Sequence, residues 1–485
     1  MQHFARFSTV AALGVAVAFA ACAPATPAER TATAPPAGGA TASPNDPFLD
    51  TLQQRTFRWF WDLTNPKNGL TRDRSPTPSF ASIASVGFAL TAYGVGVERG
   101  YVTRDQAKER ALTTLKFFWN APQGPAATGT AGHMGFFYHF LDMDSGLRFK
   151  NVELSTIDTS LLLGGVLFCQ SYFDRPDDPT EAAIRAYADS IYRRVDWQWF
   201  RTKPPFVSMG WHPEDGFINS FWSGYDEAQI LLVLALASPT HPVGPESWTE
   251  FTKNYQWRDF YGFEHVNFAP LFGHQYSHVW LDFRGIQDAY MRDKRIDYFE
   301  NSRRATLSQR AYATANPGRW RDYGGDVWGL TASDGPGDTA LAIDGRRRQF
   351  FSYRARGAAA TEVVDDGTIA PTAAGGSVPF APDVTIAALK AMRARYGDDL
   401  FGTYGFLDSF NPTLRDTTFT PKFGRIVPGK GWFNTDYIGI DQGPILLMIE
   451  NHRTGLIWNV MKKNPHIVRG LCRAGFTGGW IEGRC

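Results

Sequence analysis

The sequence of 485 residues has few cysteines, almost no net charge and no apolar run long enough to span a membrane. Its four cysteines form no CxxC pair and no histidine-rich spacing accompanies them, so we expect no metal and no cofactor. Lysine and arginine number 49 against 48 aspartate and glutamate residues, with the signs interspersed along the chain. This balance offers no basic surface, which argues against nucleic acid as a partner.

The N-terminus carries the pattern of an export signal. Arg6 provides a positive charge, residues 10–19 form a short apolar segment, and two alanines follow as a cleavage site. The apolar segment is shorter than the roughly 20 residues that a transmembrane helix needs. The stretch from Phe19 to Cys22 resembles a bacterial lipobox, in which the cysteine is acylated. We expect residues 1–21 to be a signal peptide, with ordinary secretion as the alternative to lipidation.

Residues 22–46 are expected to form a tether behind the lipidated cysteine. They consist mainly of Ala, Pro, Thr, Gly and Ser and cannot bury enough apolar surface to offset the entropy of ordering. Ala23, in place of an aspartate after the cysteine, is typical of lipoproteins sorted to the outer membrane. We therefore expect an exported outer-membrane lipoprotein that faces the periplasm or the cell surface and contacts the membrane only through its anchor. Residues 47–485 show no linker-like break, and we expect them to form one domain and a monomer.

Helical periodicity dominates residues 47–485. Phe48, Leu52 and Phe57 recur at helical spacing near the start, and Thr103 with Gln106 forms a capping box. Strands are expected only in short runs over residues 135–140, 148–154 and 362–370. Helices are expected over residues 47–63, 79–94, 103–119, 155–173, 180–195, 225–237, 245–257, 296–315, 383–395 and 441–453, with weaker patterns over 285–291 and 456–462.

About twelve helices separated by long, Gly- and aromatic-rich loops predict an all-α fold. The arrangement expected for such a chain is an (α/α)6 toroid, with six inner and six outer helices and a binding cleft formed by loops at one rim. Aromatic residues make up 14% of the chain and include 15 tryptophans. Many must lie in the core, but tryptophans in loops between helices also suit stacking against sugar rings.

The remaining cysteines are expected to have structural roles. Cys169 lies in an apolar helical run and is interpreted as a small buried hydrophobic residue. Cys472 and Cys485 could pair in an oxidising compartment, and the sequence leaves that question open.

One loop-to-helix junction places two adjacent carboxylates beside aromatic side chains. Trp222, Tyr225, Asp226 and Glu227 precede an apolar helical run. The N-terminal end of a helix stabilises a negative charge. The two acids could be ordinary charge complements of the helix, or Glu227 could be a catalytic acid with the other three residues contacting substrate.

A second junction has the same character. Glu153 and Asp158 stand at the start of a helix whose following residues, 161–169, are nearly all apolar. A helix that is apolar all round is buried. An acid at its mouth would be desolvated, and desolvation keeps a carboxylic acid protonated near neutral pH. The alternative is an N-cap by Ser155 or Thr156 with an incidental aspartate nearby.

A dense stretch over residues 272–282 offers hydrogen-bonding groups and aromatic platforms suited to a hydroxyl-rich ligand. We expect substrate contacts from His274, Tyr276, His278 and Trp280. The two histidines could instead bind a metal with Asp282, but no glutamate completes an HExxH arrangement. Among the later turn-rich segments, Trp328 and Asp366 are further candidate substrate contacts, and Asp408 is a carboxylate that lies beside aromatic residues.

Taken together, these segments resemble the bacterial glycoamylase-like family, which is related to endo-β-1,2-glucanases and to the transglycosylating domain of cyclic β-1,2-glucan synthases. The resemblance covers about residues 50 to 475. In the endo-β-1,2-glucanases the helix start at 155–159 reads more like Asp-x-x-Glu-Thr, whereas this chain has Ser155 and Asp158. The matching segments are 157–159, 225–228 with 238–242, 274–278, 297–302, 366–371, 404–406 with Asp408, and 441–444.

The resemblance implies an (α/α)6 barrel and a glycoside hydrolase that cleaves a β-linked glucan, most plainly β-1,2-glucan, with paired carboxylates. Glu227 would be the general acid, and Asp158 or Asp408 would activate water or stabilise the sugar. Two alternatives remain open at this point. One is a retaining β-1,2-glucan transglycosylase, and the other is a non-catalytic lipoprotein that binds oligosaccharides or polysaccharides.

Overall fold

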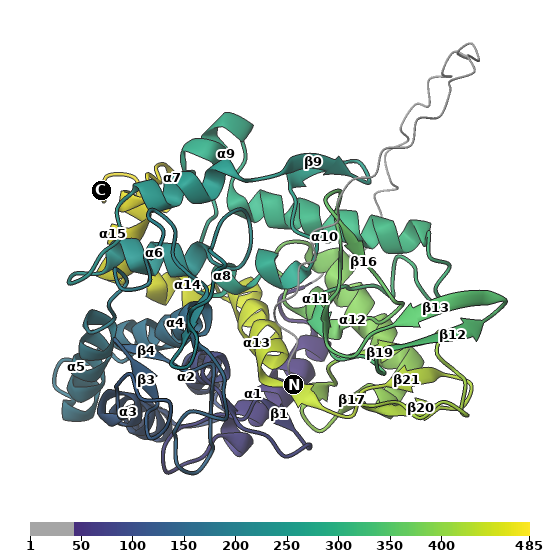
Figure 1. The fold of residues 1–485 in the computed structure, drawn as a ribbon, viewed down its shortest axis with the longest axis horizontal. Coiled ribbons are helices and arrows are strands. Elements are labelled where there is room, and N and C mark those ends of the chain that lie inside the picture. The colour runs from purple at the N-terminus through teal and green to yellow at the C-terminus, as the bar shows by residue number, and fades with distance from the viewer. Residues whose placement is uncertain (1–42) are drawn as a thin grey trace. The chain divides into compact units, whose positions relative to one another are not determined.

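The computed structural model describes residues 43–485, in which helices predominate (Figure 1). The expected signal peptide, Cys22 and nearly all of the tether lie outside the described residues. Within residues 43–485, no helix is both long and apolar enough to cross a membrane. The α-helices are α1 Pro47–Leu63, α2 Ile83–Glu98, α3 Arg104–Asn120, α4 Thr156–Tyr172, α5 Pro179–Arg193, α6 Gln229–Ala237, α7 Glu246–Lys253, α8 Tyr276–Trp280, α9 Ala289–Lys294, α10 Tyr298–Ala315, α11 Pro371–Gly375, α12 Pro382–Tyr396, α13 Gly439–Arg453, α14 Leu456–Met461 and α15 Pro465–Arg473.

Local sequence signals account for several helix ends. Asp46 caps α1 by accepting a hydrogen bond from the backbone N–H of Phe48, and a proline occupies the first turn. Thr103 and Gln106 form both hydrogen bonds of the expected capping box at α3. Ser155 caps α4 by accepting from the backbone N–H of Asp158. The predicted helices therefore begin close to where their capping residues place them.

A series of buried helices forms the centre of the described domain. Helix α2 packs against α4, α4 against α6, and α6 against α8, while α13 contacts α8, α11 and α2. Figure 1 shows α13 in the middle of the molecule. Around this series, α1 packs on α2 and α13, α5 on α4, α15 on α6, and α12 on α11. The inner helices are apolar on nearly every face because they are surrounded by protein.

Two glycines explain the close approach of α2 and α4. A Cβ atom on Gly87 would lie 2.1 Å from the carbonyl oxygen of Leu161, and one on Gly165 would lie 2.1 Å from the carbonyl oxygen of Gly87. Both distances are far inside van der Waals contact, so the two backbones touch directly. Only glycine permits that spacing.

Short strands connect the helix ends. All the pairs are antiparallel; β12 and β13 form a hairpin, β6, β7 and β8 form a three-stranded sheet, and β1 pairs with β22. The strands are β1 Arg74–Ser75, β2 Ala81–Ser82, β3 Gly132–His133, β4 Phe136–Phe137, β5 Phe140–Leu141, β6 Leu154–Ser155, β7 Gly210–His212, β8 Gly216–Phe217, β9 Trp257–Phe260, β10 Phe263–Val266, β11 Ala332–Ser333, β12 Thr339–Ile343, β13 Arg346–Phe350, β14 Arg354–Ala355, β15 Gly357–Ala358, β16 Val363–Val364, β17 Phe401–Gly402, β18 Gly405–Phe406, β19 Phe410–Asn411, β20 Arg425–Val427, β21 Gly431–Phe433 and β22 Tyr437–Ile438.

The structure differs from the sequence-based expectation in several elements. It is mostly helical with many small sheets, where an all-α chain was expected. Helices α8, α11 and α15 were not expected, and the first two are only five residues long, too short for a periodic pattern. The β12–β13 hairpin was missed although its turn contains Asp344-Gly345, a strong hairpin signal.

The three cysteines within residues 43–485 have two different roles. Cys472 and Cys485 form a disulfide, which answers the question that the sequence left open. Cys169 is a free, buried thiol within α4, as expected of a small hydrophobic residue.

Candidate active site

Asp158 lies at the mouth of α4, buried as the sequence predicted. Its Oδ2 accepts a hydrogen bond of 2.5 Å from Ser155 Oγ, and its backbone N–H donates to the same hydroxyl. Ser155 is thus the N-cap that one interpretation of this junction predicted, and Asp158 is buried as the other predicted, with burial raising the pKa of its carboxyl group.

Glu227 stands in a turn before α6, not in the first helical turn as expected. The helix begins at Gln229, and Gly224, with φ at +93°, reverses the chain ahead of the two acids. Asp226 Oδ1 accepts from the backbone N–H of Ala228. The turn is also tied to a neighbouring helix, because Ser277 Oγ of α8 donates to the carbonyl oxygen of Glu227.

Burial and neighbouring charge act together on this turn. Burial, reinforced by the charge of Asp158, raises the pKa of Glu227 to about 7. Burial and the charge of Glu227 raise the pKa of Asp226 well above its usual range. A carboxyl group that keeps its proton near neutral pH can act as a general acid.

His139 lies beside Asp158 and Glu153, although no pattern in the sequence distinguishes it. Its Nδ1 lies 2.8 Å from Glu153 Oε1, and its Nε2 lies 3.4 Å from Asp158 Oδ1. Burial disfavours its charged form, but the carboxylates of Asp158 and Glu153 outweigh burial and raise the pKa of His139 to about 9. The three side chains offer ligand-type atoms within 4.8 Å of one another. With a carboxylate opposite each ring nitrogen, we interpret this group as an ion-pair network.

Asp408 is the centre of a second group of acids. Its Oδ2 accepts hydrogen bonds from the backbone N–H of Asp334, Ser409 Oγ and Asn434 Nδ2, at 3.0, 2.8 and 2.7 Å. Burial and the charge of Asp334 raise the pKa of Asp408 to about 6.

Asp441, in the first turn of α13, lies beside Asp408. Burial and the charge of Asp408 raise the pKa of Asp441 well above its usual range. Asp408 Oδ1 and Asp441 Oδ2 are both buried and receive no hydrogen bond from any other described residue. A proton on Asp441 therefore lets it donate to Asp408 and leaves Asp408 as the ionised partner.

Arg74 anchors the acids of this second group. Its Nη1 lies 2.6 Å from Asp334 Oδ2 and 3.7 Å from Asp436 Oδ2, and its Nε lies 3.1 Å from Asp73 Oδ2. The pairing of β1 with β22 brings Arg74 to Ile438, one residue before α13. This contact between residues far apart in the chain leaves no local signal in the sequence.

Tyr276 links the two groups of acids. Its hydroxyl donates to the carbonyl oxygen of Ile440 at the start of α13. Burial and the charges of Asp441, Glu227 and Asp158 raise the pKa of the Tyr276 hydroxyl well above its usual range. Carboxylates of both groups are thus near enough to this phenol to act on it.

Comparison with known proteins identifies the family. The family model Glycoamylase, described as "Putative glucoamylase", matches residues 219–465. The chain belongs to this family. A protein of Bacteroides uniformis described as a putative glucoamylase shares 32% identity with it, covering 91% of this chain and 100% of that one, with a TM-score of 0.77.

Two further relatives of this glycoamylase family member have a stated substrate. An endo-β-1,2-glucanase from Chitinophaga pinensis, solved with sophorotriose and glucose, is 28% identical, with coverage of 90% and 99% and a TM-score of 0.75. An exo β-1,2-glucooligosaccharide sophorohydrolase of Parabacteroides distasonis is 29% identical over an alignment of 462 positions that covers 88% of this chain. The chain spans only 57% of the length of that curated relative.

Four side chains expected to contact substrate instead lie in the interior of this family member. His274 donates its Nε2–H to the carbonyl oxygen of Phe268, and His278 Nε2 pairs with Ser302 Oγ. Trp280 donates to Thr91 Oγ1 and stacks on Phe88. Trp328 is fully enclosed as well. A sequence segment rich in histidine and tryptophan does not indicate whether each side chain faces the cleft or the interior.

The two histidines are neutral, buried side chains. Burial lowers the pKa of His278 to about 3 and the pKa of His274 well below its usual range. Within residues 43–485, the one group of three ligand-type side chains contains neither of them.

Trp222 and Tyr225, which were also expected to contact substrate, are buried. Trp222 donates its indole N–H to Thr156 Oγ1, and Tyr225 lies against His274. They therefore brace the start of α4 and the turn that carries Glu227.

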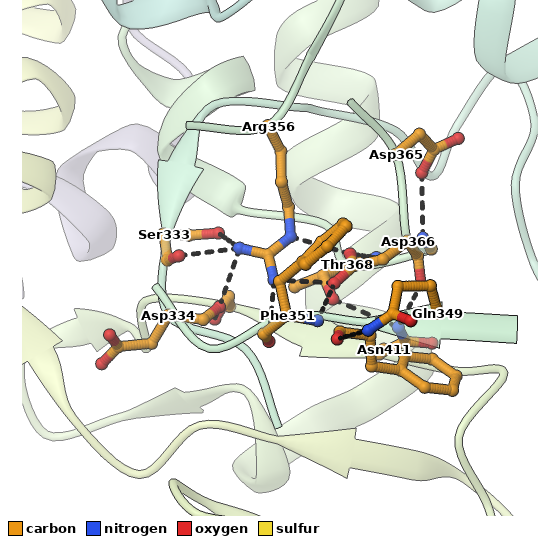
Figure 2. A network of polar contacts seen from close by, with 12 residues as sticks. Ser333, Asp334, Gln349, Phe351, Arg356, Asp365, Asp366, Thr368 and Asn411 are labelled. Atoms are coloured by element: carbon orange, nitrogen blue, oxygen red, sulfur yellow. Dashed lines mark hydrogen bonds and ion pairs between the residues drawn. The ribbon is translucent and has the colours of Figure 1, made fainter. Parts of the chain in front are cut away.

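Asp366 is also buried rather than facing substrate. Figure 2 shows it facing the guanidinium of Arg356. Arg356 Nε and Nη2 donate to its two carboxylate oxygens, at 2.7 and 2.8 Å, and both side chains are fully buried. Arg356 also donates to the carbonyl oxygen of Ser333, the residue before Asp334. The Asp366–Arg356 pair thus fastens the loop whose N–H group at 334 holds Asp408.

Proposed function

We propose that this chain is a glycoside hydrolase that cleaves β-1,2-glucan or its oligosaccharides by carboxylate acid–base catalysis. The observation that carries the proposal is Glu227, a half-buried carboxyl whose pKa is raised to about 7 beside Asp158. The relatives named for β-1,2-glucan cleavage, which align along most of this chain, support the choice of linkage.

In the proposed reaction, Glu227 protonates the glycosidic oxygen as the bond from that oxygen to the anomeric carbon breaks. Asp408 accepts a proton from a water molecule, whose oxygen bonds to the anomeric carbon. Asp408 suits the role of base because three donors and Asp441 favour its ionised form. Asp158 acts instead through its charge, which helps Glu227 to keep its proton. A single displacement of this kind inverts the anomeric configuration.

We also propose that the helices form the (α/α)6 toroid expected from the sequence. The closed series of contacts from α2 through α4, α6, α8 and α13 back to α2, with α11 packed on α13, supports an inner ring. The acids at the starts of α4, α6 and α13 would then share one rim, across which the sugar chain would lie.

The location proposed for the enzyme is the outer membrane, to which the lipidated Cys22 would anchor it. The composition of residues 1–46 supports this proposal. The disulfide between Cys472 and Cys485 also fits an oxidising compartment.

Hydrolysis of defined glucans by purified residues 43–485 tests the function. Linear β-1,2-glucan, laminarin, cellulose and starch are each incubated with and without chelator, and the products are separated by size. We expect products from β-1,2-glucan alone and no effect of chelator, with Glu227→Gln as the inactive control. Activity confined to starch would refute the proposed linkage. NMR of the fresh product distinguishes an inverted anomer from the retained one of a transglycosylase.

A further inference from the structure

Three chain segments converge on His139. The residue lies between β4 and β5, Glu153 immediately precedes β6, and Asp158 belongs to α4. A carboxylate lies opposite each ring nitrogen: Nδ1 forms a hydrogen bond of 2.8 Å with Glu153 Oε1, and Nε2 lies at an ion-pair distance of 3.4 Å from Asp158 Oδ1. A neutral imidazole has one donor, whereas the imidazolium has two. Two carboxylates on opposite nitrogens therefore match the charged form.

The backbone and the ring of His139 are also fixed. Its N–H donates to the carbonyl oxygen of Glu153 at 3.0 Å, and its carbonyl oxygen accepts from the N–H of Ile83 at the start of α2. The ring stacks on Phe140 with centroids 3.9 Å apart. The imidazole therefore has little freedom to leave the two acids.

We propose that His139 is a positioning residue, a clamp that holds Glu153 and Asp158 together and favours the charged form of Asp158 near Glu227. This inference rests on the proposed function, because it concerns how Glu227 serves as the acid.

The surrounding charges determine whether loss of His139 raises or lowers the pKa of Asp158. His139 faces Asp73 as well as its two partners, and Glu153 also faces His212. Burial raises the pKa of Asp158, and His139 is the largest influence that opposes burial. Loss of His139 would therefore leave Asp158 neutral over a wider pH range.

The effect then passes to Glu227. The charge of Asp158 contributes to the raised pKa of Glu227, which otherwise faces Asp226 and Tyr276. When Asp158 is neutral, this contribution disappears and the pKa of Glu227 falls. His139 does not touch substrate in this account and acts only through Asp158.

The first test uses no substrate. Histidine-selective 13C NMR of residues 43–485 follows each imidazole with pH, and His139→Gln identifies the signal of His139. We expect this signal to titrate near pH 9 and to move to lower pH in Glu153→Gln. Titration of His139 below pH 6.5 would overturn the clamp. A shift of the signal on adding Zn²⁺ at pH 7 would also overturn it, in favour of a metal site.

The second test measures kcat/KM on β-1,2-glucan against pH. In His139→Gln we expect the alkaline limb, which reports loss of the proton on Glu227, to move down by about one unit. His241→Gln, which replaces an exposed histidine beyond the far end of α6, is the control and should leave the profile in place. A uniform loss of activity with the limb unmoved would overturn the proposal in favour of a merely structural role.

If His139→Gln does not fold, Asp158→Asn removes the same charge directly and should also move the alkaline limb down, whereas an unmoved limb would overturn the proposal. An inactive native enzyme would refute the proposed function, while the NMR titration would still decide whether the clamp exists.

Discussion

The backbone N–H of Asp334 donates a hydrogen bond of 3.0 Å to Oδ2 of Asp408. This donor, with Ser409 Oγ and Asn434 Nδ2, favours the ionised form of Asp408. The negative charge of Asp408 thus strengthens its hydrogen bonds to these donors and also enables it to accept a proton from water.

Replacement of Asp408 by asparagine should therefore abolish most of the activity. The amide has no charge and cannot accept a proton from water, and general base catalysis typically contributes 10²–10⁴-fold. We expect kcat on β-1,2-glucan to fall by at least about 10²-fold. Asp416→Asn, which alters an exposed aspartate far from these donors, is the control. Retention of activity in Asp408→Asn would exclude it as the base.

Glu227→Gln should lower kcat by at least about 10²-fold with thermal stability nearly unchanged. The amide keeps the shape of the side chain but has no acidic proton to give. Asp226→Asn should have a smaller effect, because the amide oxygen can still accept from the backbone N–H of Ala228. Stopped assays and thermal melts of both variants check this. Unfolding of Glu227→Gln would point instead to a role in holding the turn.

The pH dependence of kcat/KM should be bell-shaped with its maximum between pH 6 and 7. Activity rises as Asp408, with a pKa of about 6, loses its proton, and it falls as Glu227, with a pKa of about 7, loses its own. Initial rates at low substrate concentration from pH 4 to 9 measure both limbs. A profile that still rises above pH 8 would be incompatible with Glu227 as the acid.

Arg356→Met should destabilise the protein strongly. The substitution leaves the carboxylate of Asp366 buried without its partner, and breaking a buried pair in this way costs about 3–5 kcal/mol. Arg321→Met breaks an exposed pair with Asp344 and should change the melting temperature little. Chemical unfolding of the two variants gives the comparison. Equal stability of both would mean that the buried pair does not hold this loop.

Cys22→Ala should release the full-length protein from the membrane fraction. Acylation at this cysteine is the proposed anchor, so the variant should appear in the soluble periplasm or the medium. Fractionation and immunoblotting of cells that express each form provide the measurement. An unchanged distribution would indicate ordinary cleavage of the signal without lipidation.

Local signals predicted the helices well where capping and periodicity coincide. Helix α1 has the predicted bounds, and the capping box at Thr103 is present. The burial of Asp158 was also predicted from the sequence, because the helix that it begins is apolar on nearly every face. The start of α6 was misplaced, since a turn stabilised by Asp226 resembles a first helical turn in sequence.

The supporting residues of the site could not be predicted in the same way. Arg74 and Asp441 meet their partners through contacts between distant parts of the chain, and His139 stands in a short strand region without any distinguishing pattern. For Trp280 and Asp366, the sequence predicted a contact with substrate, whereas the structure places both side chains in the interior. Both belong to residue types that bind sugars, but each finds its partner inside the protein.

The contact between Gly87 and Gly165 reaches beyond packing. Asp158 stands seven residues before Gly165 on the same helix, about two turns away. Any side chain at either glycine would push α4 away from α2 and carry Asp158 with it, while Glu227 would remain on its own turn. The distance between Glu227 and the charge of Asp158 is thus set by two glycines that take no part in the reaction. A substitution at either glycine would therefore alter the pKa of Glu227 without adding or removing any charge.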